Sequence, residues 1–249
     1  MHISLQAEVL GKIFGLPITN SLVLSLVTAL LLVGGGFLVA RALKLVPGKV
    51  QSGAELVVDS LLDFMTQVAG DREQAIKFFP LVATIFLFIL LNNWIGVLPG
   101  TGSIGFYEPQ GTHGESLFVP FFRSANADLN TTFALALIAM GAIQVYGIQK
   151  LGFVKHLGRF FIFTKGRIYF FVGLLELVGE FAKVLSFSFR LFVNIFAGEV
   201  LLLIIMALVP VLVPLPFIFL EYFVGFIQAL VFAMLTLVFL KVATTEVEH

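Results

Sequence analysis

The chain has 249 residues, of which 59% are hydrophobic and only 12% are charged, and its mean hydropathy is +1.05. Soluble domains carry about 25% charged residues, so the composition excludes an ordinary soluble protein and predicts one integral-membrane domain over residues 1–249. The net charge of zero gives no sign of a nucleic-acid partner, and the absence of cysteine excludes disulfides, thiolate metal sites and thiol catalysis.

The N-terminal part of the chain predicts one membrane span followed by a surface helix. Residues 21–40 carry no charge and are long enough to cross a hydrocarbon core of ~30 Å. No cleaved signal peptide is recognisable before them, so we expect this span to act as its own insertion signal. Residues 52–69 carry Glu55, Asp59 and Asp63 on one polar stripe between apolar faces. That pattern indicates an amphipathic helix lying at the membrane interface.

The middle of the chain predicts two further spans. Residues 78–98 form the second span. Residues 100–127 are polar and rich in glycine, and we expect a loop there, with some order. Asp128 then predicts the N-cap of the third span, residues 131–149, because a carboxylate accepts hydrogen bonds at a helix start. Residues 150–167 form a basic connector.

Two long apolar stretches follow, residues 168–210 and 217–240. At ~1.5 Å per residue the first would reach ~60 Å, twice the membrane core, so it must be strongly tilted, bent or partly outside the lipid. The predicted fold class is therefore all-α: a polytopic membrane protein with five transmembrane helices and one interfacial amphipathic helix. We expect the last two helices to be long and strongly tilted.

The distribution of basic residues predicts the orientation. Cytoplasmic loops are enriched in Lys and Arg, and two segments of this chain carry most of them, whereas the loop at 100–127 carries only Arg123. The basic residues are Arg41, Lys44, Lys49, Arg72 and Lys77 in the first segment and Lys150, Lys155, Arg159, Lys165 and Arg167 in the second. With five crossings, the N-terminus is predicted outside and the C-terminus in the cytoplasm.

A polar stripe runs along the fourth predicted span. Its members are separated by 4, 3, 7 and 4 positions, which keeps them within about 80° of helical arc; they are Glu176, Glu180, Lys183, Arg190 and Asn194. A guanidinium stays charged at physiological pH, so a membrane helix tolerates one only where water, a cavity or a partner receives it. Arg190 is therefore the first candidate for a functional site.

The last predicted span carries Glu221 and Gln228 on one face, seven positions apart. If Gln228 packs at the level of Arg190, Glu221 lies ~10 Å further out, close to the level of Glu199. Two such carboxylates do not readily ionise together, so the pair could hold and pass a proton. The pattern indicates an ion path in two offset halves, with Arg190 as the barrier between them. A mobile carboxylate on a partner would carry the ion around it.

Each of these residues also has a purely structural interpretation. Arg190 could form an ion pair with Glu180, and Glu199 and Glu221 could be interfacial acids. Intramembrane Gln and Asn side chains also make hydrogen bonds between helices, which would account for Gln228 and Asn194.

Four candidates of lower weight have the same ambiguity. Glu176 and Glu180 could belong to a solvated face near the cytoplasm, and Lys183 could extend to the interface or pair with Glu180. Asn92 and Asn93, near the end of the second span, could line the outer path or cap a helix.

The run RLFVNIFAGEVLL from Arg190, and IQALVFAMLTLVFL around Gln228, resemble the a-subunit family of the F-type ATP synthases. The resemblance extends to NNWIGVLPG, DLNTTFALAL and the acidic tail ending in His. It implies a non-catalytic stator subunit in which Arg190 faces the carboxylates of a rotating c-ring. It also assigns side chains to the two half-channels: Glu199, Glu221 and Gln228 in the outer one, Asn194 beside the arginine, and Glu176 and Ser186 in the inner one.

The resemblance also implies the partners and the location. We expect the c-ring, peripheral-stalk b-type subunits and the lipid bilayer as partners, in a bacterial plasma membrane. Glu221 stands where some members have His, which keeps a titratable group there but changes its charge. The transported ion is expected to be the proton, with sodium as the alternative.

Several other functions find no support in the sequence. The four histidines lie in termini or loops without ligand spacing, so we expect no metal and no cofactor. No GxxxxGK[ST] run occurs, so nucleotide is expected to bind a partner rather than this chain. There are two rival functions. A self-contained transporter or channel should show internal repeats and a substrate cavity. A membrane-embedded enzyme would need a paired nucleophile and base, and none is recognisable in the sequence.

Overall fold

The computed structural model describes residues 7–13, 15–98, 100–110, 115–153, 158, 167–209 and 212–245. In chain order the helices are α1 (Asn20–Arg41), α2 (Lys49–Ala69), α3 (Arg72–Val97), α4 (Leu129–Leu151), α6 (Arg167–Leu208) and α7 (Pro214–Thr244). All of them except α2 are long and apolar enough to cross a membrane, which confirms the five predicted spans. Helix α2 coincides with the predicted amphipathic helix.

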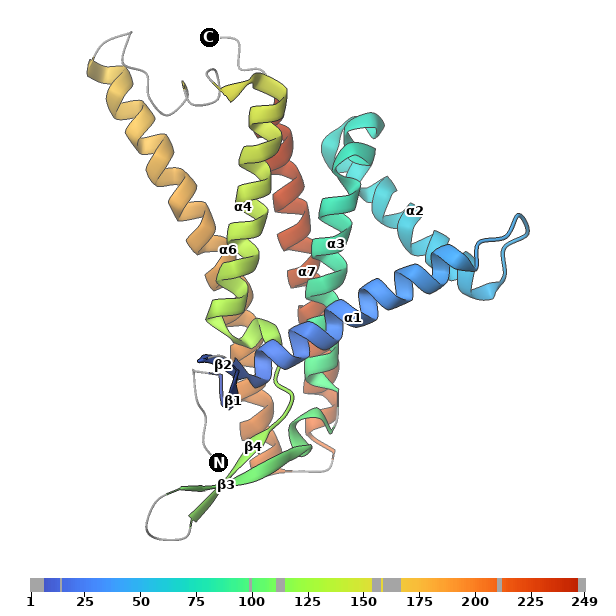
Figure 1. The fold of residues 1–249 in the computed structure, drawn as a ribbon, viewed down its shortest axis with the longest axis vertical. Coiled ribbons are helices and arrows are strands. Elements are labelled where there is room, and N and C mark those ends of the chain that lie inside the picture. Colours follow the sequence, from blue (N-terminus) through green and yellow to red (C-terminus); the bar gives the residue numbers. More distant parts are fainter. Residues whose placement is uncertain are drawn as a thin grey trace.

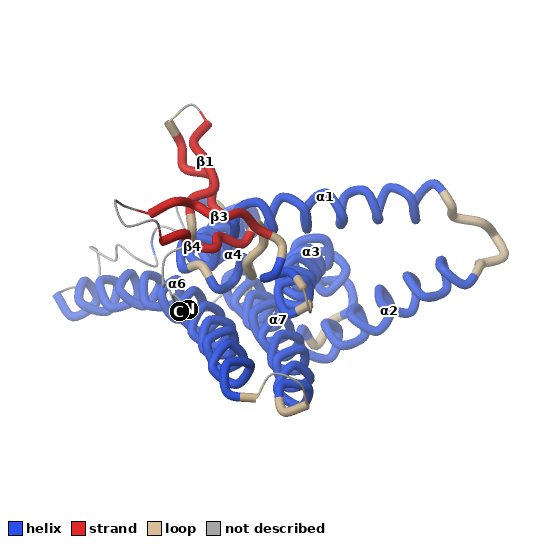
Figure 2. Tube along the Cα trace, turned by 90° about the horizontal axis from the view of Figure 1, so that it is seen from below, coloured by secondary structure: helices blue, strands red, loops and turns tan. Residues whose placement is uncertain are grey.

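Helices α3, α4, α6 and α7 run along the long axis of the molecule, and α1 crosses them at a large angle (Figure 1). Helix α2 leads from the far end of α1 back to the start of α3 (Figure 1). With 42 residues, α6 would measure ~63 Å if straight. Figure 2 shows that it changes direction part-way along. The expected length is thus confirmed, and of the three alternatives for this span the structure shows bending.

Local chemistry explains where the helices begin and end. The Asp71 carboxylate accepts hydrogen bonds from the backbone N–H groups of Glu73 and Gln74 at the start of α3. The Asp128 carboxylate accepts from the N–H of Asn130 at the start of α4, as predicted. Helix α2 ends at Gly70, whose φ of 73° is a conformation that glycine adopts without strain.

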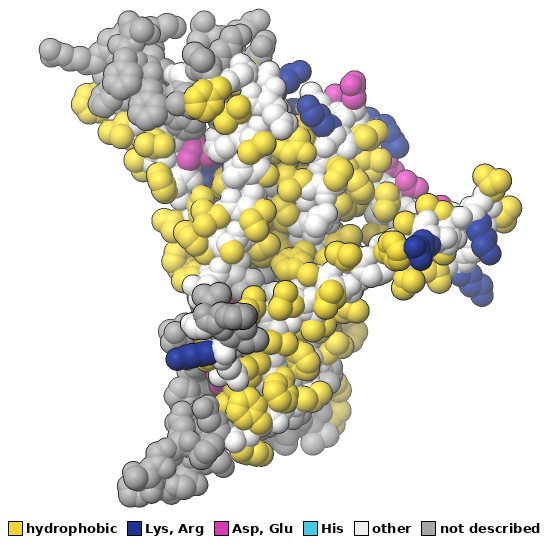
Figure 3. All heavy atoms as spheres, in the orientation of Figure 1, with side chains coloured by type: hydrophobic (Ala, Val, Ile, Leu, Met, Phe, Trp, Pro, Cys, Tyr) yellow, Lys and Arg dark blue, Asp and Glu magenta, His cyan; other side chains and the backbone are white. Residues whose placement is uncertain are grey.

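The core lies mainly where α7 packs against α3. Small residues one turn apart, Gly225, Ala229 and Ala233, form a buried stripe on α7. Small side chains let two membrane helices approach closely, and a Cβ added at Gly225 would lie 3.0 Å from the Cβ of Asn93. Hydrophobic side chains cover most of the visible outer face of the molecule, whereas charged ones gather over α2 and the turn before it (Figure 3).

Two short hairpins differ from the predicted all-helical fold. Strands β1 (Val9–Ile13) and β2 (Leu16–Thr19) pair antiparallel before α1. The predicted loop contains a second antiparallel pair, β3 (Gly105–Gln110) and β4 (Glu115–Pro120).

The same segment contains two short 3₁₀ turns, η1 (Thr101–Ser103) and η2 (Ala125–Ala127). The prediction of a loop was therefore incomplete, because strands of four to six residues carry too little periodicity to be recognised in a glycine-rich sequence.

Two features of the sequence lie largely outside the described residues. These are most of the predicted basic connector and all four histidines. Within the described ranges, no group of three or more acidic, histidine or cysteine residues could hold a metal ion.

The contact between Gly96 and Ser124 gives a test of this packing. A Cβ at Gly96 would lie 2.5 Å from the Cβ and 2.8 Å from the Cα of Ser124. Gly96→Ala should therefore lower the free energy of unfolding by about 1–3 kcal/mol, as overpacking usually does. Gly141→Ala is the control, since a Cβ there meets nothing within 4 Å. Thermal denaturation in detergent measures both, and equal stability of the two variants would contradict the packing.

Candidate ion-translocation site

Arg190 lies in the middle of α6 with its side chain exposed. In the part of the chain that the structure describes, its guanidinium makes no hydrogen bond or ion pair. It lines a small pocket of about 10 Å³ together with Gln228 of α7 and four apolar residues: Phe187, Leu191, Phe232 and Leu235. Gln228 thus lies beside Arg190, which is the condition assumed for the level of Glu221, and the pocket has room for about one water molecule.

The alternative ion pair between Arg190 and Glu180 is wrong for the structure described. The Glu180 carboxylate accepts a hydrogen bond of 2.6 Å from Lys183 Nζ and one of 3.1 Å from Gln144 Nε2. Lys183 also lies over the ring of Phe239, at 4.9 Å from its centroid. Of the two alternatives for Lys183, the structure shows the pairing with Glu180, so these two charges offset each other.

Three further candidate residues on α6 are at least partly accessible. Ser186 is exposed, and Glu176 and Asn194 are half-buried. The side chains of Asn194 and Gln228 have no hydrogen-bond partner within the described ranges. The alternative that Asn194 and Gln228 form hydrogen bonds between helices therefore finds no support. Both side chains remain available to water or to a group from outside the chain.

Glu199 of α6 and Glu221 of α7 come together as predicted. The Glu221 carboxylate packs against Gly198, where a side chain on α6 would otherwise stand. Glu199 is the next residue on α6. Glu221 is buried, and its Oε1 atom has no hydrogen-bond partner among the described residues. Because a residue larger than glycine at position 198 would occupy the same space, Gly198 is what admits this carboxylate between the helices.

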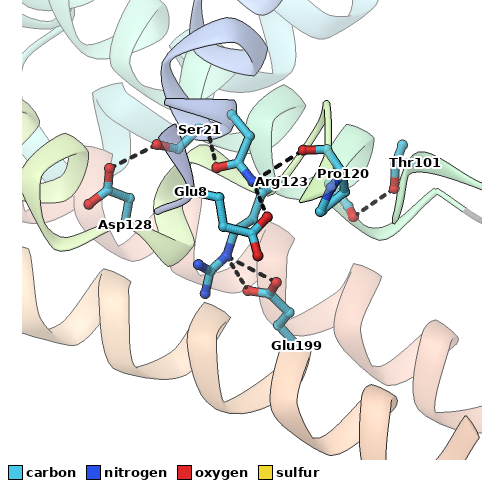
Figure 4. Close-up of polar contacts among 9 residues, drawn as sticks. Glu8, Ser21, Thr101, Pro120, Arg123, Asp128 and Glu199 are labelled. Carbon is cyan, nitrogen blue, oxygen red and sulfur yellow. Dashed lines mark hydrogen bonds and ion pairs between the residues drawn. The ribbon is translucent and has the colours of Figure 1, made fainter. Parts of the chain in front are cut away.

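Arg123 is a residue of the site that sequence reasoning missed. Its Nε donates to both carboxylate oxygens of Glu199, at 3.1 and 3.2 Å (Figure 4). The Arg123 side chain is only 9% exposed and lies 5.9 Å from the ring centroid of Phe196. The available signal was that Arg123 is the one basic residue of the segment at 100–127.

Glu8 and Asn20 complete the surroundings of this ion pair. The Asn20 Nδ2 group donates to the Glu8 carboxylate and to the backbone carbonyl of Pro120, both at 3.4 Å. Figure 4 shows these contacts beside the pair of Arg123 and Glu199. The segments before α1 and after β4 are thus tied together next to Glu199.

Asn92 and Asn93 do not cap a helix, because both are buried inside α3. Asn92 Oδ1 accepts a hydrogen bond of 3.1 Å from Thr28 of α1. Asn93 Nδ2 donates to the carbonyl of Gly225 on α7 at 2.9 Å, and its Oδ1 accepts one of 2.7 Å from Asn126. These two asparagines join α3 to its neighbours.

Comparison with known proteins agrees with this architecture. The family model described as ATP synthase A chain matches residues 22–241. ATP synthase subunit a 3 of Pelobacter propionicus is 36% identical over 224 residues, which cover 89% of this chain and 85% of the relative. ATP synthase subunit a of Campylobacter jejuni is 34% identical over 223 residues, covering 88% of each. The chain therefore belongs to the ATP synthase A chain family, as a subunit a of the membrane proton-channel sector.

Proposed function

We propose that the chain conducts protons through two offset half-channels to and from a rotating c-ring, and so couples proton flow to ATP synthesis elsewhere in the complex. The observation that carries this proposal is Arg190, an exposed guanidinium in a membrane span with no partner among the described residues. A charge left unpaired in lipid is strongly unfavourable. A carboxylate of another subunit would stabilise it.

The pairing of Arg190 with a ring carboxylate also supplies a mechanism for moving protons. A ring carboxylate is neutral while it faces lipid, because burial of an unpaired charge is costly. Beside Arg190 the ionised form is stabilised, so the carboxyl group releases its proton there. Direct passage of a proton past the fixed guanidinium is opposed by repulsion. Protons must therefore travel with the ring.

Two sets of polar side chains line the outer and the inner half-channel. On the outer side, Glu199 lies ~13 Å along α6 from Arg190, with Glu221 beside it and Gln228 near the arginine. On the inner side, Ser186 lies about one turn from Arg190 and Glu176 ~21 Å away.

The remaining candidates take supporting roles in this proposal. Glu180 and Lys183 form a neutral pair in the inner wall. Asn92 and Asn93 hold α3 in place beside the outer path.

The orientation and the further partners belong to the same proposal. The chain is an integral membrane protein, and we place its N-terminus outside and its C-terminus in the cytoplasm of a bacterium. The charged surface of α2 then lies at the cytoplasmic interface, where peripheral-stalk b-type subunits would contact it. In the rival role as a self-contained transporter, the chain would transport ions alone in liposomes, whereas here it requires the ring.

Replacing Arg190 tests the central role. Arg190→Ala in the assembled complex should abolish ATP-driven proton pumping, because the ring carboxylate loses the charge that makes it release its proton. Arg72→Ala is the matched control, since Arg72 forms an exposed ion pair with Asp63 away from the site. Pumping is followed with a pH-sensitive dye in reconstituted vesicles, and normal coupled pumping by the Arg190 variant would refute the proposal.

Replacing Glu199 tests the outer half-channel. Glu199→Gln should slow passive proton conduction from the outside by at least about tenfold, because the variant breaks the ion pair of Glu199 with Arg123 in the wall of the path. Glu73→Gln is the control, since Glu73 is an exposed acidic residue in the first turn of α3. Unchanged conduction by the Glu199 variant would exclude this residue from the outer half-channel.

The identity of the ion can be tested on the unmodified complex. If protons are transported, ATP-driven pumping should proceed at the same rate with and without added sodium. A requirement for sodium would show that the coupling ion is sodium.

A further inference from the structure

We propose that Arg123 and Glu199 form a fixed, charge-balanced pair in the outer wall, and that Glu221 is the carboxylate that takes up and releases the translocated proton. This inference rests on the proposed function, because it concerns the outer half-channel defined there. It assigns different roles to Glu199 and Glu221, the two acids of the outer half-channel.

The contacts of Glu199 argue that it stays ionised. Both of its carboxylate oxygens accept hydrogen bonds from Arg123 Nε, and the Arg123 side chain is 9% exposed. A charge-assisted contact of this kind stabilises the carboxylate, and its strength increases as water is excluded. A proton arriving at Glu199 would have to disrupt both of these hydrogen bonds. Glu199 is therefore a poor carrier of protons.

Glu221 has the opposite surroundings. It is buried against Gly198, its Oε1 has no hydrogen-bond partner, and no basic side chain among the described residues pairs with it. A buried carboxyl without a counter-charge is favoured in its neutral form. In that form it passes its proton to an ionised ring carboxylate, and the Glu221 carboxylate left behind then takes a proton from a hydronium ion on the outer side. One O–H bond forms and one breaks in each transfer, and Glu221 returns to its starting state.

A third acid near the pair completes the balance of charge. The Glu8 carboxylate is close enough to Glu199 for the two to repel each other. Glu8, Arg123 and Glu199 together carry two negative charges and one positive charge, a net charge of −1. Removing Glu199 alone leaves a net charge of 0, removing Arg123 alone leaves −2, and removing both restores −1. The double variant is therefore a test of charge balance that neither single variant provides.

The experiment uses the whole ATP synthase in liposomes and measures ATP synthesis driven by an imposed proton gradient, so that protons enter from the outer side. Arg123→Gln and Glu199→Gln should each slow synthesis by at least about tenfold, because removing one member of a buried ion pair leaves an uncompensated charge in the outer wall. The double variant should return to within about threefold of the unmodified rate. Glu221→Gln should abolish synthesis, because the proton carrier is lost.

Two results would overturn the inference. A double variant as slow as Glu199→Gln would make Glu199 itself an obligatory proton carrier, and a Glu221→Gln complex with normal synthesis would exclude Glu221 from that role. Arg123→Lys keeps the charge and should stay within about threefold of the unmodified rate; a rate as low as that of Arg123→Gln would contradict charge balance. If Glu199→Gln and Glu221→Gln both synthesise ATP normally, the outer half-channel of the proposed function fails instead.

Discussion

The guanidinium of Arg190 is the constraint on which the rest of the structure depends. It cannot be neutralised by losing a proton, it lies in an apolar span, and no acidic side chain of the described residues pairs with it. The nearest acid on its own face, Glu180, is already occupied by Lys183 and Gln144. A membrane protein with such a charge requires either water or a carboxylate from outside the chain, and the family to which the chain belongs works within a larger complex.

The packing of α7 fixes what stands next to that charge. Gly225, Ala229 and Ala233 allow α7 to lie close against α3, and Asn93 binds the carbonyl of Gly225 across the contact. The position of α7 set in this way places Gln228 in the pocket with Arg190. It also places Glu221 against Gly198.

Sequence reasoning predicted those features that depend on one helix at a time. The five spans and the cap at Asp128 follow from hydropathy, helical spacing and local capping chemistry, whereas the approach of Gln228 to Arg190 was only assumed. The ion pair of Arg123 with Glu199 joins residues 76 positions apart, and no periodic pattern connects a loop residue to a helix at that separation. The two hairpins were missed for a related reason, since backbone pairing between short strands leaves little trace in composition.

The most direct measurement for the central claim is an experimental structure of the assembled complex with the ring attached, to see which group faces Arg190. The account predicts a ring carboxylate within about 4–6 Å of the guanidinium, the range in which an opposite charge controls ionisation. An Arg190 side chain that instead pairs with an acid of its own chain, or faces lipid at every ring position, would contradict the account.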